Sequence, residues 1–150
     1  MDMKRILMVA LMAGFSLLGY AQKVKPVEYG GSINLQEVVD KKNDVYKVRV
    51  IGYGKKDAQA QEDAEVRVIR MALYTGIDGE CRPLLREETN KLDDFFENKQ
   101  YKDYISDVAA AGGLMKQKGL KVKKMPFDIV VRIGALEQYL RRNGVKKFGF

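Results

Sequence analysis

The sequence lacks histidine and has only one cysteine among its 150 residues. Without histidine, the chain cannot form the Ser-His or Cys-His pairs that activate nucleophiles in many enzymes. One cysteine also leaves no ordinary ligand set for zinc or copper, which proteins hold with several thiolate and imidazole groups. We therefore expect neither a metal site nor a cofactor.

Cys81, the single cysteine, cannot form a disulfide within the chain. It could pair with a second chain, act as a nucleophile or fill a small apolar space. Its neighbours Pro83, Leu84 and Leu85 favour the third interpretation. Stability must then come from packing.

The remaining candidates for acid–base catalysis are two pairs of adjacent carboxylates, Glu87-Glu88 and Asp93-Asp94. Adjacent residues of a helix point about 100° apart, so neither pair converges on one point. Glu87 and Glu88 are sufficiently explained by a helix start, where acidic side chains are favourable. A carboxylate-dependent hydrolase is therefore the third of three functional hypotheses, after two that involve no catalysis.

Long apolar runs are absent except at residues 6–18. Lys4 and Arg5 precede this run, and Gly19 and Ala21 place small residues where a signal peptidase requires them. This arrangement is typical of a secretory signal peptide. We predict a cleaved signal peptide over residues 1–21 and an exported chain, periplasmic or secreted, that begins at Gln22.

Two other interpretations of the apolar run fit less well. A membrane-spanning helix needs about 20 predominantly apolar residues, and Gln22 and Lys23 end the run before that length. A lipoprotein signal would carry its acylated cysteine at the position of Tyr20. No other stretch is apolar enough to span a bilayer, so we expect no transmembrane segment in the mature chain.

The chain left after cleavage has 129 residues, with 25 basic and 19 acidic side chains. This length suits one domain with its own core. Outside the cytoplasm, a basic surface suggests an anionic glycan, a lipid headgroup or an acidic protein as partner, and no nucleic acid. Scattered charge also serves solubility alone.

The N-terminal part of the mature chain predicts an extended lead-in over residues 22–31, because it contains Pro26 and a glycine pair. A single domain follows over residues 32–150. Three apolar residues at helical spacing predict a short helix over residues 34–41.

Apolar and basic side chains alternate over residues 45–54, which predicts a half-buried strand. Residues 57–75 have an alanine-containing apolar stripe at helical spacing, which predicts the principal helix. Gly76 followed by Ile77 is a typical helix stop.

The C-terminal half predicts a shorter helix over residues 87–99, a strand over residues 101–108 and a long strand pattern over residues 119–133. Pro126 interrupts that pattern and should lie at an edge or a bulge. A last helix opens at residue 134 or 135. Together these elements predict an α+β fold of two layers: an antiparallel or mixed sheet of three to four strands, with helices mainly on one face.

The segment at residues 52–56, with sequence GYGKK, lies between the expected strand and the principal helix. Glycine-rich turns at this position can bind phosphate at a helix N-terminus. Asp57 stands where a dinucleotide fingerprint has glycine or alanine, and the spacing does not match a P-loop. A tight strand-to-helix connection explains the glycines better.

Basic side chains are the only candidate binding residues, and alternation places them on outward-facing strand positions. If their strands are neighbours, the open sheet face carries a positive patch for an anionic partner. Lysines on a solvated face also protect a sheet from edge aggregation. The pattern alone therefore does not separate a binding surface from a solvated face without a ligand. The candidates are Lys47, Arg49, Lys121, Lys123 and Lys124, extended along the rim by Lys116 and Lys118.

Residues 48–73, VRVIGYGKKDAQAQEDAEVRVIRMAL, follow a strand, Gly-x-Gly and alanine-rich-helix order. This order resembles the opening of small exported envelope domains, such as the N-terminal domain of flagellar assembly protein T and related periplasmic and lipoprotein modules. The resemblance implies a periplasmic α+β module used in assembly or protein contacts. It supplies no catalytic residue.

The first hypothesis is therefore an exported, non-enzymatic cell-envelope protein that binds a protein partner or helps an assembly. The second is a binder of anionic envelope glycan or lipid headgroups through the lysine-rich sheet face. Salt dependence separates them, because contacts with a polyanion weaken as salt screens them and apolar contacts persist.

Overall fold

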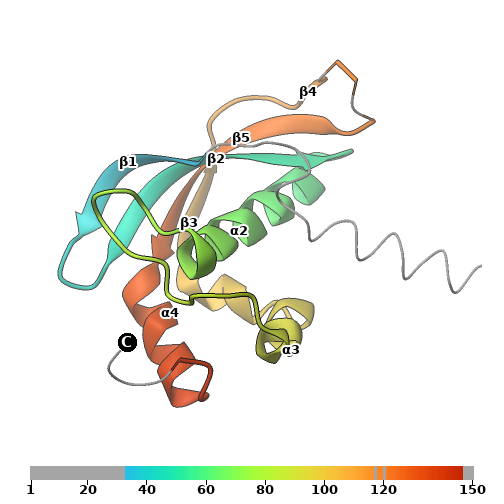
Figure 1. The fold of residues 1–150 in the computed structure, drawn as a ribbon. Helices are drawn as coiled ribbons and strands as arrows, with labels where there is room; N and C mark the ends of the chain where they lie inside the picture. The colour runs from blue at the N-terminus through green and yellow to red at the C-terminus, as the bar shows by residue number, and fades with distance from the viewer. Residues whose placement is uncertain (1–32, 117, 120, 147–150) are drawn as a thin grey trace, which may run out of the picture. The chain divides into compact units, whose positions relative to one another are not determined.

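The computed structural model describes residues 33–116, 118–119 and 121–146, so the predicted signal peptide and lead-in lie outside the described residues. Within them the chain forms five strands and three α-helices (Figure 1). In chain order these are β1 (Ile33–Asp40), β2 (Val45–Gly54), α2 (Asp57–Tyr74), α3 (Asp93–Glu97), β3 (Ile105–Ala110), β4 (Met115–Lys116), β5 (Lys123–Arg132) and α4 (Ile133–Arg142). Two 3₁₀ turns, η2 (Asn90–Leu92) and η3 (Gln100–Tyr104), flank α3.

The strands form one antiparallel sheet in the order β1-β2-β5-β3, and the short β4 pairs with the first residues of β5. β2 and β5 pair along ten residues without a register shift, from Val45 opposite Arg132 to Gly54 opposite Lys123. The helices lie together on one side of the sheet (Figure 1). The predicted two-layer α+β fold is confirmed, with one more strand than expected.

The core lies between the sheet and α2, as alternation along β2 predicts. Tyr46, Val48 and Val50 are almost completely buried, whereas Lys47 and Arg49 point to the other face. The apolar stripe of α2 packs against them with small residues that allow close approach. The buried residues of this stripe are Ala60, Ala64, Val68, Ile69, Met71, Ala72 and Leu73.

The helix stops predicted from glycine are present at α2 and α4. Gly76 has a φ of 73°, and its N–H donates to the Met71 carbonyl at 2.7 Å. Gly144 has a φ of 70°, and the next residue, Val145, donates to the Leu140 carbonyl at 2.9 Å. Both glycines adopt the left-handed conformation that ends a helix and that other residues adopt at a cost.

The predicted helix over residues 34–41 is wrong, because this segment forms strand β1. β1 pairs with β2 through a short turn in which Asp44 has a φ of 51°. Its pairing shifts register between Leu35 and Glu37 and again between Val38 and Asp40. These irregularities break the two-residue alternation of a strand and leave an apolar spacing that also fits a helix.

Two elements between residues 87 and 108 also start or end differently from the sequence prediction. The helix expected over residues 87–99 is limited to η2 and α3, and residues 101–104 of the expected strand belong to η3 instead. The reason is a cluster of aromatic rings that holds this segment against α4. Its ring centroids lie 5.1–6.0 Å apart and belong to Phe95, Phe96, Tyr101, Tyr104 and Tyr139.

Pro126 lies inside β5, opposite Ile51 of β2 with no bulge between them. The irregularity falls on the other neighbour of β5, where residues 111–114 separate β3 from β4. The Pro126 carbonyl accepts from the Ala111 N–H on this side at 2.9 Å. The N–H and C=O of one strand residue point toward the same neighbouring strand. The N–H that proline lacks would therefore also point toward residues 111–114, where the pairing of β5 is interrupted.

Among the described residues, no helix has both the length and the apolar character needed to cross a membrane.

Candidate functional site

The face of the sheet turned away from α2, α3 and α4, the helices of the described residues, carries a mixed set of side chains. We define the helix-free face by three residues of β2 and three of β5, paired directly across the two strands. The pairs are Lys47 with Val130, Arg49 with Asp128 and Ile51 with Pro126. All except the exposed Arg49 are half-buried. The set therefore combines apolar surface with one charged pair at its centre.

The Arg49 guanidinium and the Asp128 carboxylate form that pair. Nε of Arg49 donates to Oδ1 at 2.9 Å, and Nη2 donates to Oδ2 at 3.0 Å. This two-pronged geometry holds the pKa of Asp128 below its usual value and raises that of Arg49. Arg49, a predicted binding residue, is thus already engaged with an acid that the sequence prediction did not include.

The structure separates the five predicted binding residues into two groups. Lys47 and Arg49 lie in the middle of the helix-free face, whereas Lys121, Lys123 and Lys124 belong to the turn and strand of the β4–β5 hairpin. Lys123 is opposite Gly54 and Lys124 opposite Tyr53, at the far end of β2. The lysines do not form the continuous patch on the sheet face that alternation suggested.

The glycines of residues 52–56 are explained by the packing of α2 on β2. A Cβ on Gly52 would collide with the Ala60 carbonyl and lie 2.9 Å from the Ala64 Cβ. A Cβ on Gly54 would lie 2.7 Å from the Ala60 nitrogen. The Lys55 N–H is occupied by the Gln59 side chain at 3.0 Å. These contacts support the tight strand-to-helix connection.

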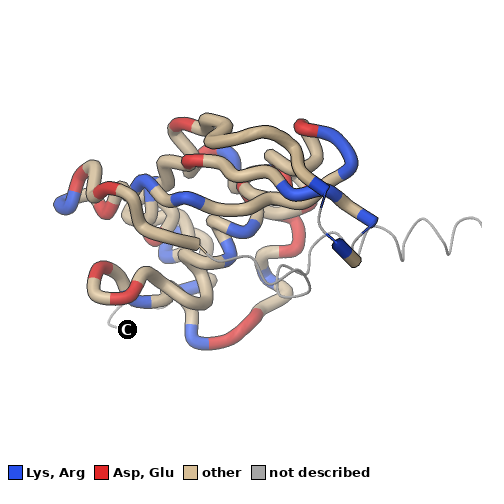
Figure 2. Tube along the Cα trace, turned by 90° about the horizontal axis from the view of Figure 1, so that it is seen from above, with Lys and Arg blue, Asp and Glu red and all other residues tan. Residues whose placement is uncertain are grey.

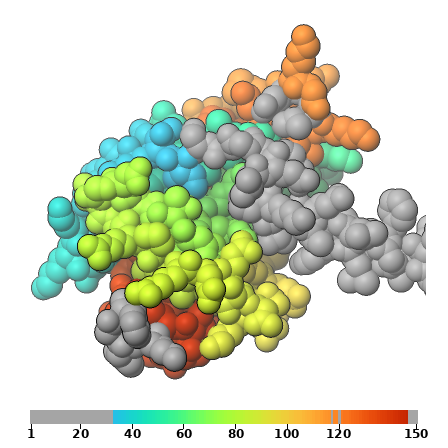
Figure 3. Space-filling view, in the orientation of Figure 1, coloured from blue at the N-terminus to red at the C-terminus, as the bar shows by residue number. Residues whose placement is uncertain are grey.

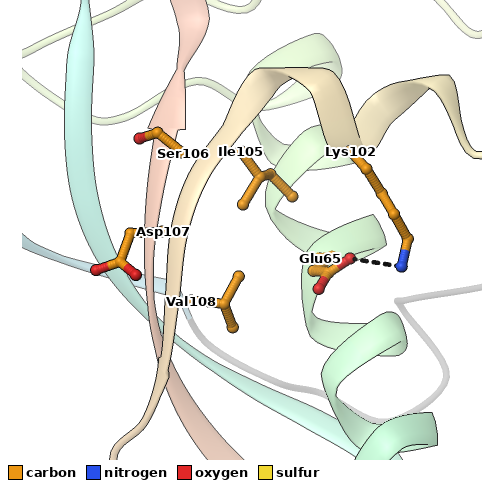
Figure 4. A pocket seen from close by; sticks show the side chains of 6 residues that line it. All are labelled: Glu65, Lys102, Ile105, Ser106, Asp107 and Val108. Atoms are coloured by element: carbon orange, nitrogen blue, oxygen red, sulfur yellow. Dashed lines mark ion pairs between the residues drawn. The ribbon is translucent and has the colours of Figure 1, made fainter.

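A hollow of about 270 Å³ lies between β3 and α2 (Figure 4). Glu65 of α2 reaches into it and is only 4% exposed. Its Oε1 accepts from the Gln61 side chain at 2.9 Å, and Lys102 of η3 lies 3.5 Å from its Oε2. Ile105 and Val108 turn toward the same space, because the register shift in β3 makes Ser106 an extra residue. A buried carboxylate here depends on Lys102 for charge compensation.

A second buried charged group was not predicted from the sequence. Arg67 of α2 is 4% exposed and lies over the Tyr53 ring at 4.9 Å. Its Nε donates to Asp63 Oδ2 at 2.6 Å, and the Tyr53 N–H donates to the same oxygen at 2.8 Å. Burial raises the pKa of Asp63, and the Arg67 hydrogen bond opposes this change. The four-residue spacing of Asp63 and Arg67 was the available signal.

The cysteine and the paired carboxylates considered for catalysis do not converge on a common site. Cys81 is half-buried against the core, and burial raises the pKa of its thiol. Glu88 is exposed and pairs with Arg70 at 2.8 Å, while Glu87, Asp93 and Asp94 are exposed. These carboxylates line neither the hollow beside Glu65 nor the one beside the β1–β2 turn. Over the described residues no three acidic or cysteine side chains come together as metal ligands.

Comparison of the chain with protein families, with curated proteins and with solved structures finds no match. The resemblance of residues 48–73 to exported envelope domains therefore stays a prediction.

Proposed function

We propose that the chain is an exported, non-enzymatic module of the cell envelope that binds another protein through its helix-free face. The observation that carries this proposal is the surface around the Arg49–Asp128 pair, where half-buried apolar side chains of Ile51, Pro126 and Val130 surround an arginine. Protein interfaces combine apolar residues with arginine at their centre and have few lysines there.

The charge balance of this face favours a protein over a polyanion. Arg49 is paired with Asp128, and β1 places Glu37 opposite Lys47. A polyanion would have to displace these acids, whereas a protein surface can match both signs of charge. Export is the part of the proposal that comes from the sequence alone, and N-terminal sequencing that finds Gln22 on the processed protein would support it.

The experiment introduces a charge into the helix-free face and measures binding to an envelope partner. The partner is first recovered from envelope extracts with the unmodified chain and identified. Ile51→Glu should weaken its binding at least tenfold, because its carboxylate would be buried in the contact opposite Pro126, which offers no cation. Gln138→Glu, which adds the same charge on exposed residues of α4, should leave binding unchanged.

Salt provides the second measurement. A contact built on apolar side chains should persist at about 0.5 M salt, where the screening length is only a few ångströms. Equal loss of binding in the two variants, or complete loss in high salt, would contradict this proposal.

A further inference from the structure

The β4–β5 hairpin concentrates positive charge more strongly than any part of the sheet face. Between residues 111 and 127 the sequence has five lysines and no acidic residue. We call these lysines the basic hairpin: Lys116, Lys118, Lys121, Lys123 and Lys124. Figure 2 shows blue segments gathered at one side of the domain, and in Figure 3 the hairpin projects from the body of the domain.

The charges of the basic hairpin are not compensated by the described part of the protein. None of the five lysines forms an ion pair with a described residue, in contrast to Lys99 and Lys102, which pair with Glu62 and Glu65. Lys116 also lies directly opposite Lys123 in the β4–β5 ladder. Like charges in facing positions destabilise a strand pair, so this arrangement opposes folding of the hairpin. An anionic partner would remove that repulsion.

The neighbouring end of β2 adds to the same positive field. Gly54 pairs with Lys123, and the exposed Lys55 and Lys56 follow it directly. Asp57 is the one acid next to them in sequence. α4 follows the other end of β5, so the basic residues gather at the end of the sheet opposite this helix.

An apolar side chain lies on the same face of the hairpin as Lys124, whereas Lys116 and Lys123 share the opposite face. Met115 pairs with Lys124 and is 49% exposed, one of three large apolar side chains exposed among the described residues. A soluble polyanion has no layer of acyl chains for this side chain to enter. At a membrane surface, lysines bind anionic headgroups while an adjacent apolar side chain enters the boundary of the acyl chains.

We propose that the basic hairpin docks the protein on an anionic lipid bilayer, with lysines of both of its faces against the headgroup phosphates and Met115 inserted beside Lys124. This surface is separate from the helix-free face, whose Arg49 is paired with Asp128. A docked hairpin would leave the helix-free face available to a protein partner. The two proposals therefore stand or fall independently.

The test measures sedimentation of the full chain with vesicles of phosphatidylglycerol and phosphatidylcholine in equal parts, and with vesicles of phosphatidylcholine alone. The unmodified chain should bind the anionic vesicles and bind the neutral vesicles much more weakly. The triple variant Lys116→Gln, Lys118→Gln, Lys121→Gln should lose about 100-fold in affinity, because each lysine near an anionic surface contributes roughly fivefold.

A matched control removes three exposed lysines elsewhere, through Lys41→Gln, Lys42→Gln and Lys91→Gln. This control has the same net charge as the hairpin variant, so it should retain at least half of the affinity if position matters. Equal losses in the two variants would overturn the proposal, because they would show attraction by net charge alone. Circular dichroism of each variant checks that the fold is retained.

Met115→Gln separates a bilayer from a soluble polyanion. It should weaken binding to anionic vesicles several-fold and leave binding to heparin unchanged, because only the bilayer offers an apolar layer. If Met115→Gln binds the vesicles as well as the unmodified chain, or if heparin binds more tightly than the vesicles, the proposal of a lipid surface is overturned.

Discussion

Arg49 and Asp128 face each other across the two central strands of the sheet. Nε and Nη2 of the guanidinium donate to the two carboxylate oxygens at 2.9 and 3.0 Å. The pair lies 79 residues apart in sequence and depends on the regular β2–β5 register. It occupies the middle of the helix-free face and neutralises an arginine that would otherwise be available to an anion.

The first prediction concerns the pH dependence that this pair creates. Because Arg49 lowers the pKa of Asp128 in the folded protein, the stabilisation is present above the unfolded pKa of about 4 and is lost as pH falls through the lower folded value. Asp128→Asn should therefore lower the urea midpoint at pH 7, and the difference from the unmodified protein should shrink toward zero at about pH 2.

Asp107→Asn is the matched control, because Asp107 is an exposed acid on the neighbouring strand β3 and has no ion pair with a described residue. Its urea midpoint at pH 7 should differ little from that of the unmodified protein, because the substitution removes no such pair. A constant difference for Asp128→Asn would show that the pair does not contribute in solution.

A second prediction follows from the contact of β2 with α2. Gly52→Ala places a methyl group against the Ala60 carbonyl, so α2 must move away from the sheet. We expect a loss of about 1–3 kcal/mol in the free energy of unfolding, or more if the helix cannot shift. Gly113→Ala meets nothing within 4 Å and should change stability little. Urea denaturation measures both, and equal effects would refute the packing explanation of these glycines.

The principal strand and helix could be predicted from the sequence because each buries one face with its own periodicity. Residues 45–54 and α2 have this property, and both were predicted within one residue. β1 was mistaken for a helix because two register shifts break its alternation. β1 is a strand because it pairs with β2, and the sequence pattern of residues 33–40 carries no information about that pairing.

The candidate site was predictable only in part, for a similar reason. Alternation correctly placed Lys47 and Arg49 away from the core. The partner Asp128 depends on strand register, and the position of Lys121, Lys123 and Lys124 depends on where the hairpin turns. Both are properties of the paired sheet, so neither follows from one strand alone.

A third prediction tests the ion pair beside β3, between the buried Glu65 and the exposed Lys102. Lys102→Met leaves the Glu65 carboxylate buried without its cation, and we expect a loss of about 1–3 kcal/mol in stability. Glu65→Gln should have the smaller effect, because Lys102 is 46% exposed and can turn to water. Chemical denaturation measures the two changes.

The matched control for this pair is Lys99→Met. Lys99 pairs with Glu62 one turn earlier on α2, but both side chains are about half exposed, so the effect should be small. An equal effect at Lys99 and Lys102, or a larger effect of Glu65→Gln than of Lys102→Met, would contradict this account of the Glu65 hollow.

A fourth prediction concerns Cys81. Because burial raises the pKa of its thiol, little of the reactive thiolate forms near neutral pH. Alkylation by iodoacetamide at pH 7 should be at least tenfold slower in the folded protein than in urea, as measured by mass spectrometry. Equal rates in the two conditions would indicate an accessible nucleophile and would reopen the catalytic interpretation of this residue.

The central claim, that the helix-free face is the protein-binding surface, is tested most directly by site-specific photo-crosslinking in the producing cells. A photoreactive amino acid at Val130 reports on this face, and one at Gln138 reports on exposed α4. Our account predicts one defined crosslinked protein from position 130 and none of it from position 138. Crosslinking of that protein from position 138 alone, or equally from both positions, would contradict it.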